Sequence, residues 1–204
     1  PEFLDLMKAA YEKAGYELLG YSDQGFRVMS TNKKVETIDD FKGQKIRTME
    51  NAYHLQFWKQ MGANPTPMSF SEVYIGLQQG TIDAQENAYE IIVSAKLYEQ
   101  QKYLISTNAV PDYTTLIVSD EFYQGLTKEQ QKIIDQAAKT AQEKARESAD
   151  DRRVQRQKVL EDEGMQIVDV DQKTWKQMQE KCQPVYDSIR KQAGDKLVDL
   201  YMGK

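Results

Sequence analysis

The sequence predicts an α/β fold, with a mixed, mostly parallel sheet flanked by helices. Three observations support this. Short segments typical of strands, such as 45–49, 81–84 and 165–170, alternate with segments of helical periodicity. Glycines and prolines separate these segments by short connections. The 204 residues are 40% hydrophobic and 29% charged, a composition that supports a substantial core.

The helices and strands follow from periodicity and from turn residues. Helices are expected over 3–14, 51–61, 70–79, 88–98, 127–164, 172–182, 185–193 and 195–202, and strands over 16–21, 25–30, 45–49, 81–84, 102–106, 113–119 and 165–170. The segment 64–67, Asn-Pro-Thr-Pro, is not expected to be helical, because each proline lacks an N–H donor and favours an extended predecessor. Ser69 with Glu72, and Thr127 with Gln130, have the spacing of capping boxes.

The helix expected over 127–164 is the longest element, about 54 Å at 1.5 Å per residue. The middle of its inward face carries mostly alanines, so it buries little apolar surface. It is therefore expected to lie against something close or to stand partly free of the rest of the chain.

The composition also narrows the functional classes. A net charge of -5 argues against a nucleic-acid partner. A single cysteine, Cys182, excludes an internal disulfide and is interpreted as an inert thiol in a polar helix. The only histidine, His54, is interpreted as a packing or surface residue, so neither a zinc cluster nor a histidine-based acid–base pair is expected. No metal or cofactor is predicted, and no segment has the roughly 20 apolar residues of a membrane span.

Two polar residues stand at the ends of expected strands. Arg47 lies in the strand 45–49, and Asn87 follows the strand 81–84 and precedes the next helix. Ligands of such sheets bind beyond the carboxyl ends of the strands, and a guanidinium can hold a carboxylate with two hydrogen bonds. One interpretation is therefore a carboxylate site with Arg47, Arg27 and Asn87. The alternative is two solvated arginines and an asparagine N-cap.

Several motifs resemble one family of transport proteins. They are Thr66-Pro67-Met68-Ser69-Phe70-Ser71-Glu72-Val73-Tyr74, Leu77-Gln78-Gln79-Gly80, Asp83-Ala84-Gln85-Glu86-Asn87 and Lys42-Gly43-Gln44-Lys45-Ile46-Arg47. Together they resemble the solute-binding subunits of tripartite ATP-independent periplasmic (TRAP) transporters of the dicarboxylate-binding type. The resemblance is strongest from about residue 25 to about residue 160 and implies a non-enzymatic, periplasmic-binding-protein-like α/β receptor. Such a receptor closes two lobes on an organic acid, such as a C4-dicarboxylate, and delivers it to a TRAP membrane permease.

The family's ligand residues match particular positions of this chain. Its main arginine matches Arg47, its second arginine Arg27, its ligand-contacting asparagine Asn87 and a pocket aromatic Phe70. The family's usual Asp-Gly-Gln-Glu-Asn-Pro is here Asp-Ala-Gln-Glu-Asn-Ala over 83–88. This departure is expected to alter the turn that aims Asn87.

The resemblance covers only the C-terminal two-thirds of the family's length. It assigns residues 1–24 to a remnant of lobe 1, 25–112 to lobe 2, 113–150 to a strand and an inter-lobe helix, and 151–204 to a return to lobe 2. The implied location is periplasmic, with the signal peptide and most of the first lobe outside this chain. Isolated, the chain is therefore expected to bind ligand weakly or not at all. The resemblance also implies that the 127–164 helix spans both lobes of an intact receptor, so that here it lacks a partner surface and favours domain swapping or dimerisation.

Two alternatives from other classes remain at this point. The first is a small carboxylate-processing enzyme, such as a lyase or isomerase, with Asp83 or Glu86 as its base. The second is a helical interaction protein built on the 127–164 helix. Loss of function after Arg47→Ala would indicate the receptor rather than the scaffold.

Overall fold

A computed structural model of the chain describes residues 2–203. Contacts within the chain divide it into two compact units. Unit 1 comprises Pro1–Gly25, Asp112–Asp151 and Arg190–Lys204, and unit 2 comprises Phe26–Pro111 and Arg152–Ile189. The sequence-based division instead keeps 151–204 together, and the assignment of the two units to receptor lobes stays a prediction.

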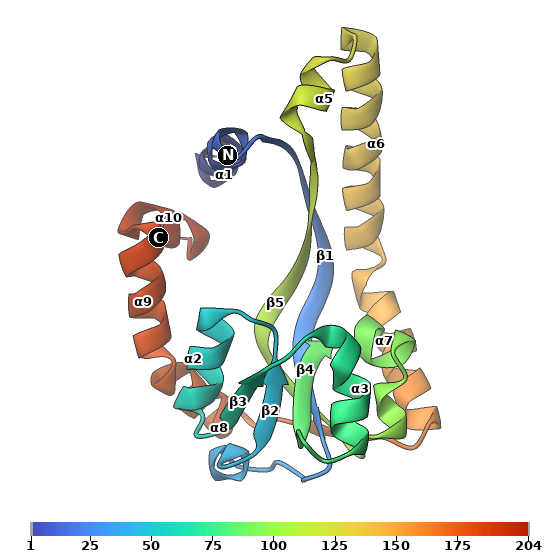
Figure 1. The fold of residues 1–204 in the computed structure, drawn as a ribbon, viewed down its shortest axis with the longest axis vertical. Coiled ribbons are helices and arrows are strands. Elements are labelled where there is room, and N and C mark those ends of the chain that lie inside the picture. The colour runs from blue at the N-terminus through green and yellow to red at the C-terminus, as the bar shows by residue number, and fades with distance from the viewer. Residues whose placement is uncertain (1, 204) are drawn as a thin grey trace. The chain divides into compact units, whose positions relative to one another are not determined.

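A six-stranded mixed sheet is the central element (Figure 1), with the order β3-β2-β4-β1-β5-β6. Its strands are β1 (Tyr16–Thr31), β2 (Lys45–Thr48), β3 (Asn64–Pro67), β4 (Ala84–Ala88), β5 (Tyr103–Ser119) and β6 (Gln166–Asp169). Strand β2 pairs in parallel with both β3 and β4, and β5 pairs in parallel with β6. Strand β1 runs antiparallel to β4. The predicted mixed α/β sheet is confirmed.

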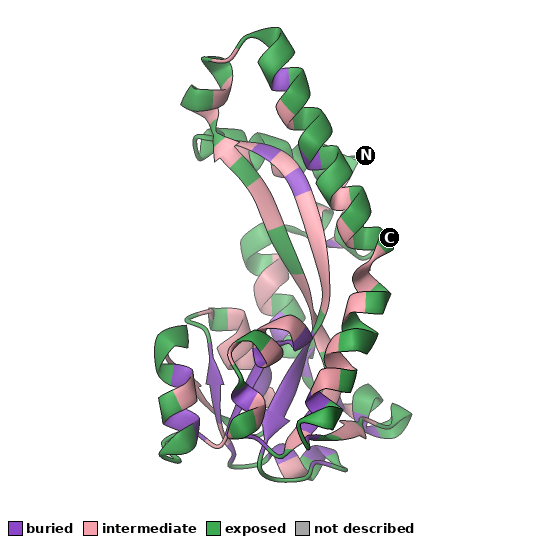
Figure 2. Ribbon diagram, turned by 90° about the vertical axis from the view of Figure 1, so that its right-hand side faces the viewer, coloured by how far each residue is buried: buried purple, intermediate pink, exposed green. Residues whose placement is uncertain are grey.

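Unit 2 buries an apolar core on each face of this sheet. Its helical elements are α2 (Ala52–Gln60), α3 (Phe70–Gln78), α4 (Tyr89–Ser94), most of α7 (Ala149–Asp162), α8 (Gln172–Lys181), most of α9 (Gln183–Ala193) and the 3-10 helices η1 (Ile38–Phe41) and η2 (Leu97–Glu99). Helices α2, α8 and α9 supply one core, and α3, α4 and α7 supply the other. Met29 and Val28 lie in different cores because successive strand side chains point to opposite faces. Figure 2 shows the buried strands in purple.

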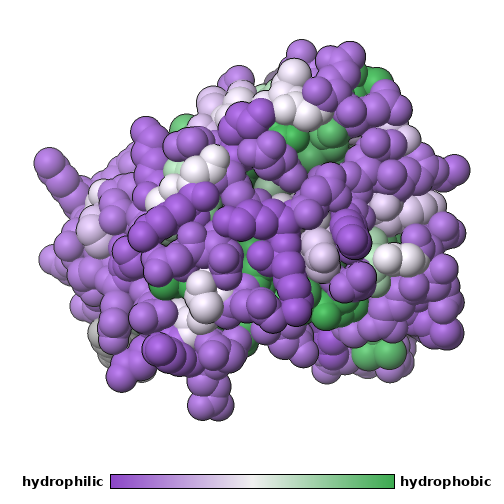
Figure 3. Space-filling view, turned by 90° about the horizontal axis from the view of Figure 1, so that it is seen from below, coloured by the Kyte–Doolittle hydropathy of each residue, from purple (hydrophilic) through white to green (hydrophobic). Residues whose placement is uncertain are grey.

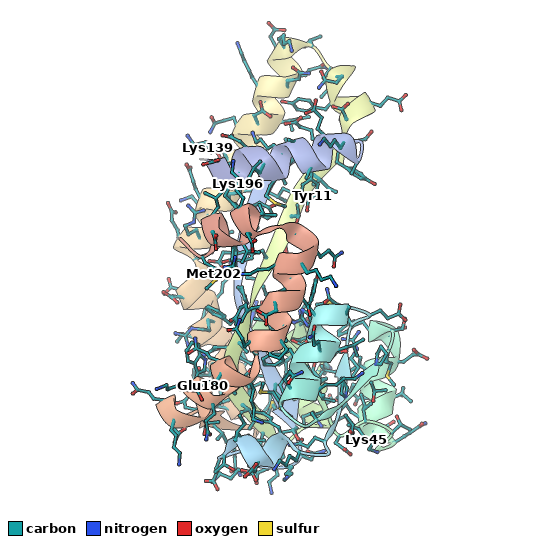
Figure 4. The ribbon with its side chains drawn as sticks, turned by 90° about the vertical axis from the view of Figure 1, so that its left-hand side faces the viewer. Tyr11, Lys45, Lys139, Glu180, Lys196 and Met202 are labelled. Carbon is teal, nitrogen blue, oxygen red and sulfur yellow. The ribbon has the colours of Figure 1, made fainter. Side chains whose placement is uncertain are left out.

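Unit 1 contains α1 (Glu2–Lys13), α5 (Asp120–Gln124), α6 (Lys128–Glu147) and α10 (Asp195–Tyr201), together with parts of β1 and β5. Helices α1 and α10 lie side by side, with Lys196 of α10 labelled in Figure 4. An ion pair of 2.6 Å joins Glu2 to Lys196, and the rings of Phe3 and Tyr201 lie 5.8 Å apart. These two contacts tie the first helix to the last.

Within unit 1, one glutamine of α6 reaches the backbone of β1. The Gln142 side chain accepts a hydrogen bond from the Tyr21 amide at 3.2 Å and donates one to the Leu19 carbonyl at 3.1 Å. Gly20, between them, has φ +147, and a Cβ built on it would lie 2.0 Å from Gln142 Oε1. Glycine is therefore required here, because a side chain would occupy the position of the Gln142 amide.

The predicted single helix over 127–164 is wrong, because the structure divides it into α6 and α7 at Ser148. The Ser148 hydroxyl donates to the Lys144 carbonyl at 2.8 Å and also lies 3.4 Å from the Ala145 carbonyl. A serine that bonds back to the preceding turn competes with the helical ladder, which accounts for a break at this position. The start of α6 is as predicted, with Thr127 and Gln130 forming a capping box.

Other boundaries differ where tertiary pairing overrides local signals. Segments 16–21 and 25–30 form one strand, β1, and segments 102–106 and 113–119 form one strand, β5. Ser69 is the N-cap of α3 but makes no side-chain capping bond, so the predicted capping box with Glu72 is wrong. Asn87 lies within β4 rather than before a helix, and the expected helix 88–98 is only α4 followed by η2. The segment 64–67 is the edge strand β3, a position that tolerates proline.

The Cys182 thiol lies in the core of unit 2 rather than in a polar environment. It follows α8, is 7% exposed and packs in the same cluster as Met178 and Val185. Burial raises the pKa of this thiol to about 11. It also borders a cavity of about 170 Å³ that is lined in part by Trp175 and Tyr186.

The face of the molecule in Figure 3 is mostly hydrophilic, with separate apolar patches. Among residues 2–203, no helix is both long and apolar enough to cross a membrane.

Candidate functional site

The four residues predicted to bind ligand all lie in unit 2. Arg27 is on β1, Arg47 on β2 and Asn87 on β4, and Phe70 is the first residue of α3. These three strands are neighbours in the sheet, in the order β2-β4-β1 (Figure 1). Arg27, Arg47 and Asn87 are 7%, 4% and 5% exposed, whereas Phe70 is 45% exposed. The interpretation of the two arginines as solvated surface residues is therefore wrong.

Arg27 is held by residues of β4. Its Nε donates to Glu86 Oε2 at 2.6 Å, and its Nη2 lies 3.2 Å from Glu86 Oε1. Nη2 also donates to the Glu86 carbonyl at 2.7 Å and to Asn87 Oδ1 at 2.9 Å. The antiparallel register of β1 and β4 sets these contacts by placing Arg27 opposite Ala88 and Met29 opposite Glu86. Two of the predicted ligand residues, Arg27 and Asn87, are thus in direct contact.

Glu86 joins Arg27 to the only histidine. His54 Nδ1 on α2 lies 3.1 Å from Glu86 Oε1, and the carboxylate is 2% exposed. Burial by itself raises the pKa of the Glu86 carboxyl, but the contacts with His54 and Arg27 outweigh it and lower the pKa below the ordinary value of 4.5. Glu86 therefore carries a negative charge in the folded chain at neutral pH.

Arg47 is oriented by the connection between β3 and α3. Its Nε and Nη2 donate to the Met68 carbonyl at 2.9 and 2.7 Å. Its guanidinium carbon lies 5.7 Å from the centre of the Phe70 ring. Burial has the largest effect and lowers the pKa of Arg47 below its ordinary value; the negative charge of Glu86 raises it in part, and the positive charge of Arg27 lowers it further. Arg47 therefore lies within electrostatic range of the Arg27–Glu86 pair, and a guanidinium stays charged under these conditions.

Buried amide side chains connect Asn87 to the interior. Asn87 Nδ2 donates to Gln85 Oε1 at 2.6 Å, Gln85 Nε2 donates to Ser30 Oγ at 2.7 Å, and Ser30 Oγ lies 3.2 Å from Gln101 Oε1. This chain of hydrogen bonds fixes the orientation of the Asn87 amide.

Sequence reasoning missed two members of this network, Glu86 and His54. In the sequence analysis Glu86 appears only as a candidate base of the alternative enzyme, and His54 as a packing or surface residue. Every residue of β4 (Ala84–Ala88) is buried, and a buried carboxylate needs a charged or hydrogen-bonding partner. A strand predicted over 84–88 instead of 81–84 would therefore have indicated such a partner for Glu86. Among residues 2–203, no group of three or more histidine, cysteine or acidic side chains is placed to hold a metal ion.

Comparison with known proteins identifies the family. The model of bacterial extracellular solute-binding protein, family 7, also called DctP, matches residues 2–192. The chain belongs to this family. The resemblance to TRAP solute-binding subunits is thereby confirmed, and the family is one of solute-binding proteins.

Several members of this family are similar to this chain in sequence and fold. The 2,3-diketo-L-gulonate-binding periplasmic protein of Escherichia coli is 38% identical over 138 residues, which are 67% of this chain and 43% of that protein. A TRAP periplasmic solute-binding protein from Haemophilus influenzae with bound L-gulonate matches with a TM-score of 0.92 and 35% identity. One from Sulfitobacter with bound β-D-galacturonate matches with a TM-score of 0.92 and 30% identity.

Both structural matches cover 100% of this chain and 68% of the solved chain. The chain spans about half the length of the curated relatives it matches, between 43% and 55% for the first three.

Proposed function

We propose that this chain is the ligand-recognising part of a periplasmic receptor that binds an organic acid and delivers it to a TRAP membrane permease, without catalysis. In this proposal Arg47 anchors the ligand carboxylate, Arg27 adds positive charge, Asn87 donates a hydrogen bond and Phe70 packs on the ligand. The proposal draws support from the family and from the sugar acids bound in two similar structures.

The orientation of Arg47 is the observation that carries the proposal. Nε and Nη2 both donate to one carbonyl, which fixes the plane of the guanidinium. Within the described part of the chain, Nη1 of Arg47 has no hydrogen-bond acceptor. A buried guanidinium with a fixed plane and an unused donor is suited to a charge-assisted bond with a carboxylate.

The enzyme alternative receives no support from its two candidate bases. Glu86 is paired with Arg27, and its lowered pKa makes it a poor proton acceptor at neutral pH. Asp83 accepts a hydrogen bond from the Lys45 amide at 2.8 Å and pairs with the Lys45 ammonium at 3.6 Å. The scaffold alternative is weakened because its single long helix is two shorter ones. Self-association or domain swapping through α6 stays a prediction.

Removal of the Arg47 guanidinium tests the proposal. We expect L-gulonate to shift ¹⁵N–¹H resonances of the isolated chain with a Kd on the order of 1 mM. Arg47→Ala is expected to raise this Kd at least about tenfold, because a charge-assisted hydrogen bond contributes about 1.5–3 kcal/mol. NMR titration at constant ionic strength measures both constants. Nanomolar binding would contradict the weak binding expected of this chain.

Lys45→Ala is the matched control for Arg47→Ala. Lys45, labelled in Figure 4, lies on the same strand and carries the same charge, but its side chain is 45% exposed. We expect Lys45→Ala to bind as the parent chain does. Equal affinities for the parent and Arg47→Ala, or equal losses in both variants, would refute the assignment of Arg47 as the anchor.

A further inference from the structure

The cavity of about 170 Å³ in unit 2 is lined by residues other than those of the organic-acid site. Four of its side chains are aromatic: Phe26, Phe57, Trp175 and Tyr186. Phe26, Trp175 and Tyr186 are 39–47% exposed, so a small molecule can reach the cavity from solvent. None of the four residues assigned to the organic acid lines it, and none of its described lining side chains is charged.

The inner wall of the cavity is held by packing between aromatic rings. Phe57 is 7% exposed and lies edge-on to Trp58, with ring centres 4.9 Å apart and an interplanar angle of 81°. Trp58 packs in turn against Phe41, at 5.7 Å between ring centres. Met178 also lines the cavity, and a thioether sulfur packs favourably beside an aromatic ring. Because an apolar cavity of about 150 Å³ can hold benzene, this cavity has the size for a single ring.

Two amide side chains supply polar groups to the cavity. Asn108 on β5 and Gln179 on α8 line it, and within the described part of the chain neither side chain has a hydrogen-bond partner. The backbone of Asn108 has φ +45 inside β5, a conformation that asparagine adopts more readily than most residues. Successive side chains of a regular strand point to opposite faces, whereas Asn108 and Ala109 both line this cavity. The irregular backbone therefore accounts for an amide at this position.

We propose that this cavity is a second binding site of the chain, for a small neutral aromatic ring that carries a hydroxyl group, such as a phenol. The ring packs against the aromatic wall, and the hydroxyl bonds to the amide of Asn108 or Gln179. A charged ligand would lose its hydration here without gaining a charged partner among the lining side chains. An aliphatic ligand would leave the faces and edges of the aromatic rings unused.

A titration of phenol into the full chain provides the first test. Phenol should shift the ¹⁵N–¹H resonances of the Trp175 indole and of the Ala109 and Gln179 amides, with a Kd on the order of 1 mM. Cyclohexanol has a ring of the same size and a hydroxyl group but no π system, and it should bind about fivefold more weakly or worse.

Four results of this titration would overturn the proposal. They are no localised shift at about ten times the expected Kd, shifts centred on Arg47 instead of the cavity, equal binding of cyclohexanol, and tighter binding of tetramethylammonium than of phenol. The last result would assign the aromatic rings to a cation.

Trp175→Ala provides the second test, because it removes one aromatic wall. It should raise the Kd of phenol about tenfold or more. Ile75→Ala on α3 is the matched control, since Ile75 is also a large apolar residue, is 48% exposed and does not line the cavity. We expect Ile75→Ala to bind phenol as the parent chain does. Equal Kd values for the parent and Trp175→Ala, or equal losses in both variants, would overturn the proposal.

The double variant Asn108→Gly with Gln179→Ala tests recognition of the hydroxyl group, and it keeps the proposal testable if Trp175→Ala does not fold. Glycine removes the Asn108 amide and accepts a φ of +45. The double variant should raise the Kd of phenol about fivefold or more. Gln177→Ala removes an amide from the same helix that does not line the cavity, so it should leave the Kd unchanged. An unchanged Kd in the double variant, or the same increase in Gln177→Ala, would overturn the proposal.

Discussion

At the scale of single residues, the pair Arg27–Glu86 combines two full charges with almost complete burial. The two side chains are 8% and 3% exposed. Charges taken out of water are costly unless they are paired and hydrogen-bonded. Here Glu86 contacts both Arg27 and His54, and Arg27 also donates to Asn87. The residues that recognise ligand in our proposal are therefore also part of the folded core of unit 2.

Loss of the Glu86 charge should destabilise the chain. We expect Glu86→Gln to lower the free energy of unfolding by about 3–5 kcal/mol at neutral pH, because it leaves the Arg27 charge buried without its partner. Urea unfolding followed by circular dichroism measures the change. The half-exposed pair Glu90–Arg156 is the comparison, and Glu90→Gln should cost less than about 1 kcal/mol.

The pH dependence of this stability has a definite sign. Folding lowers the pKa of Glu86 below its ordinary value of 4.5. Its contribution is therefore complete above that value and is lost as the pH falls through the lower pKa of the folded chain. The parent chain should lose more stability on acidification through this window than Glu86→Gln does. Parallel profiles for the two proteins would contradict an ionised Glu86.

At the scale of elements, local rules predicted the helix starts and the sheet better than they predicted where elements end. The capping box at Thr127 depends only on neighbouring residues and was found as predicted. The lengths of β1, β4 and β5 depend on distant partners. Asn87, for example, is part of a strand because it pairs with Val28. No signal within a few residues of Asn87 contains that information, so the sequence could not supply it.

The same reasoning explains what was predictable about the site. Arg47, Arg27 and Asn87 follow from the expected strands, and the matching motifs support them and add Phe70. The structure places all four in unit 2, with contacts that join Arg27 to Asn87 and Arg47 to Phe70. Their roles in binding stay predictions. Glu86 and His54 were missed because their contact depends on how α2 packs on the sheet.

The contact between α6 and β1 gives a prediction at this scale. Gly20→Ala should destabilise unit 1 by about 2–4 kcal/mol, because it displaces Gln142 from two backbone hydrogen bonds and strains a positive φ. Gln142→Ala should lower the free energy of unfolding by about 1–2 kcal/mol, because it removes only the two hydrogen bonds. Urea unfolding of both single variants and the double variant forms the test. The double variant should cost less than the sum, and strict additivity would contradict the displacement.

At the scale of the whole molecule, two compact units are built from interrupted stretches of one chain. Each unit includes residues that are far apart in the sequence, and β1 and β5 contribute to both. Both ends of the chain belong to unit 1, so a truncation that reaches unit 2 from either end also removes part of unit 1. This organisation is why the binding and stability experiments above use the full chain with single substitutions.

Cys182 makes the packing of unit 2 measurable in time. As the only thiol in the sequence, buried and with a pKa of about 11, it should react with alkylating reagents only when its surroundings open. Val185→Ala, in the same core cluster, should accelerate alkylation about tenfold or more by lowering the free energy of opening. Ile133→Ala, at a position 68% exposed in unit 1, should leave the rate unchanged.

If the folded chain were alkylated at Cys182 as fast as the chain in concentrated urea, the thiol would not be protected by the fold. Otherwise the half-life of this one sulfhydryl group during alkylation, followed by mass spectrometry, reports how often the core of unit 2 opens to solvent and closes again.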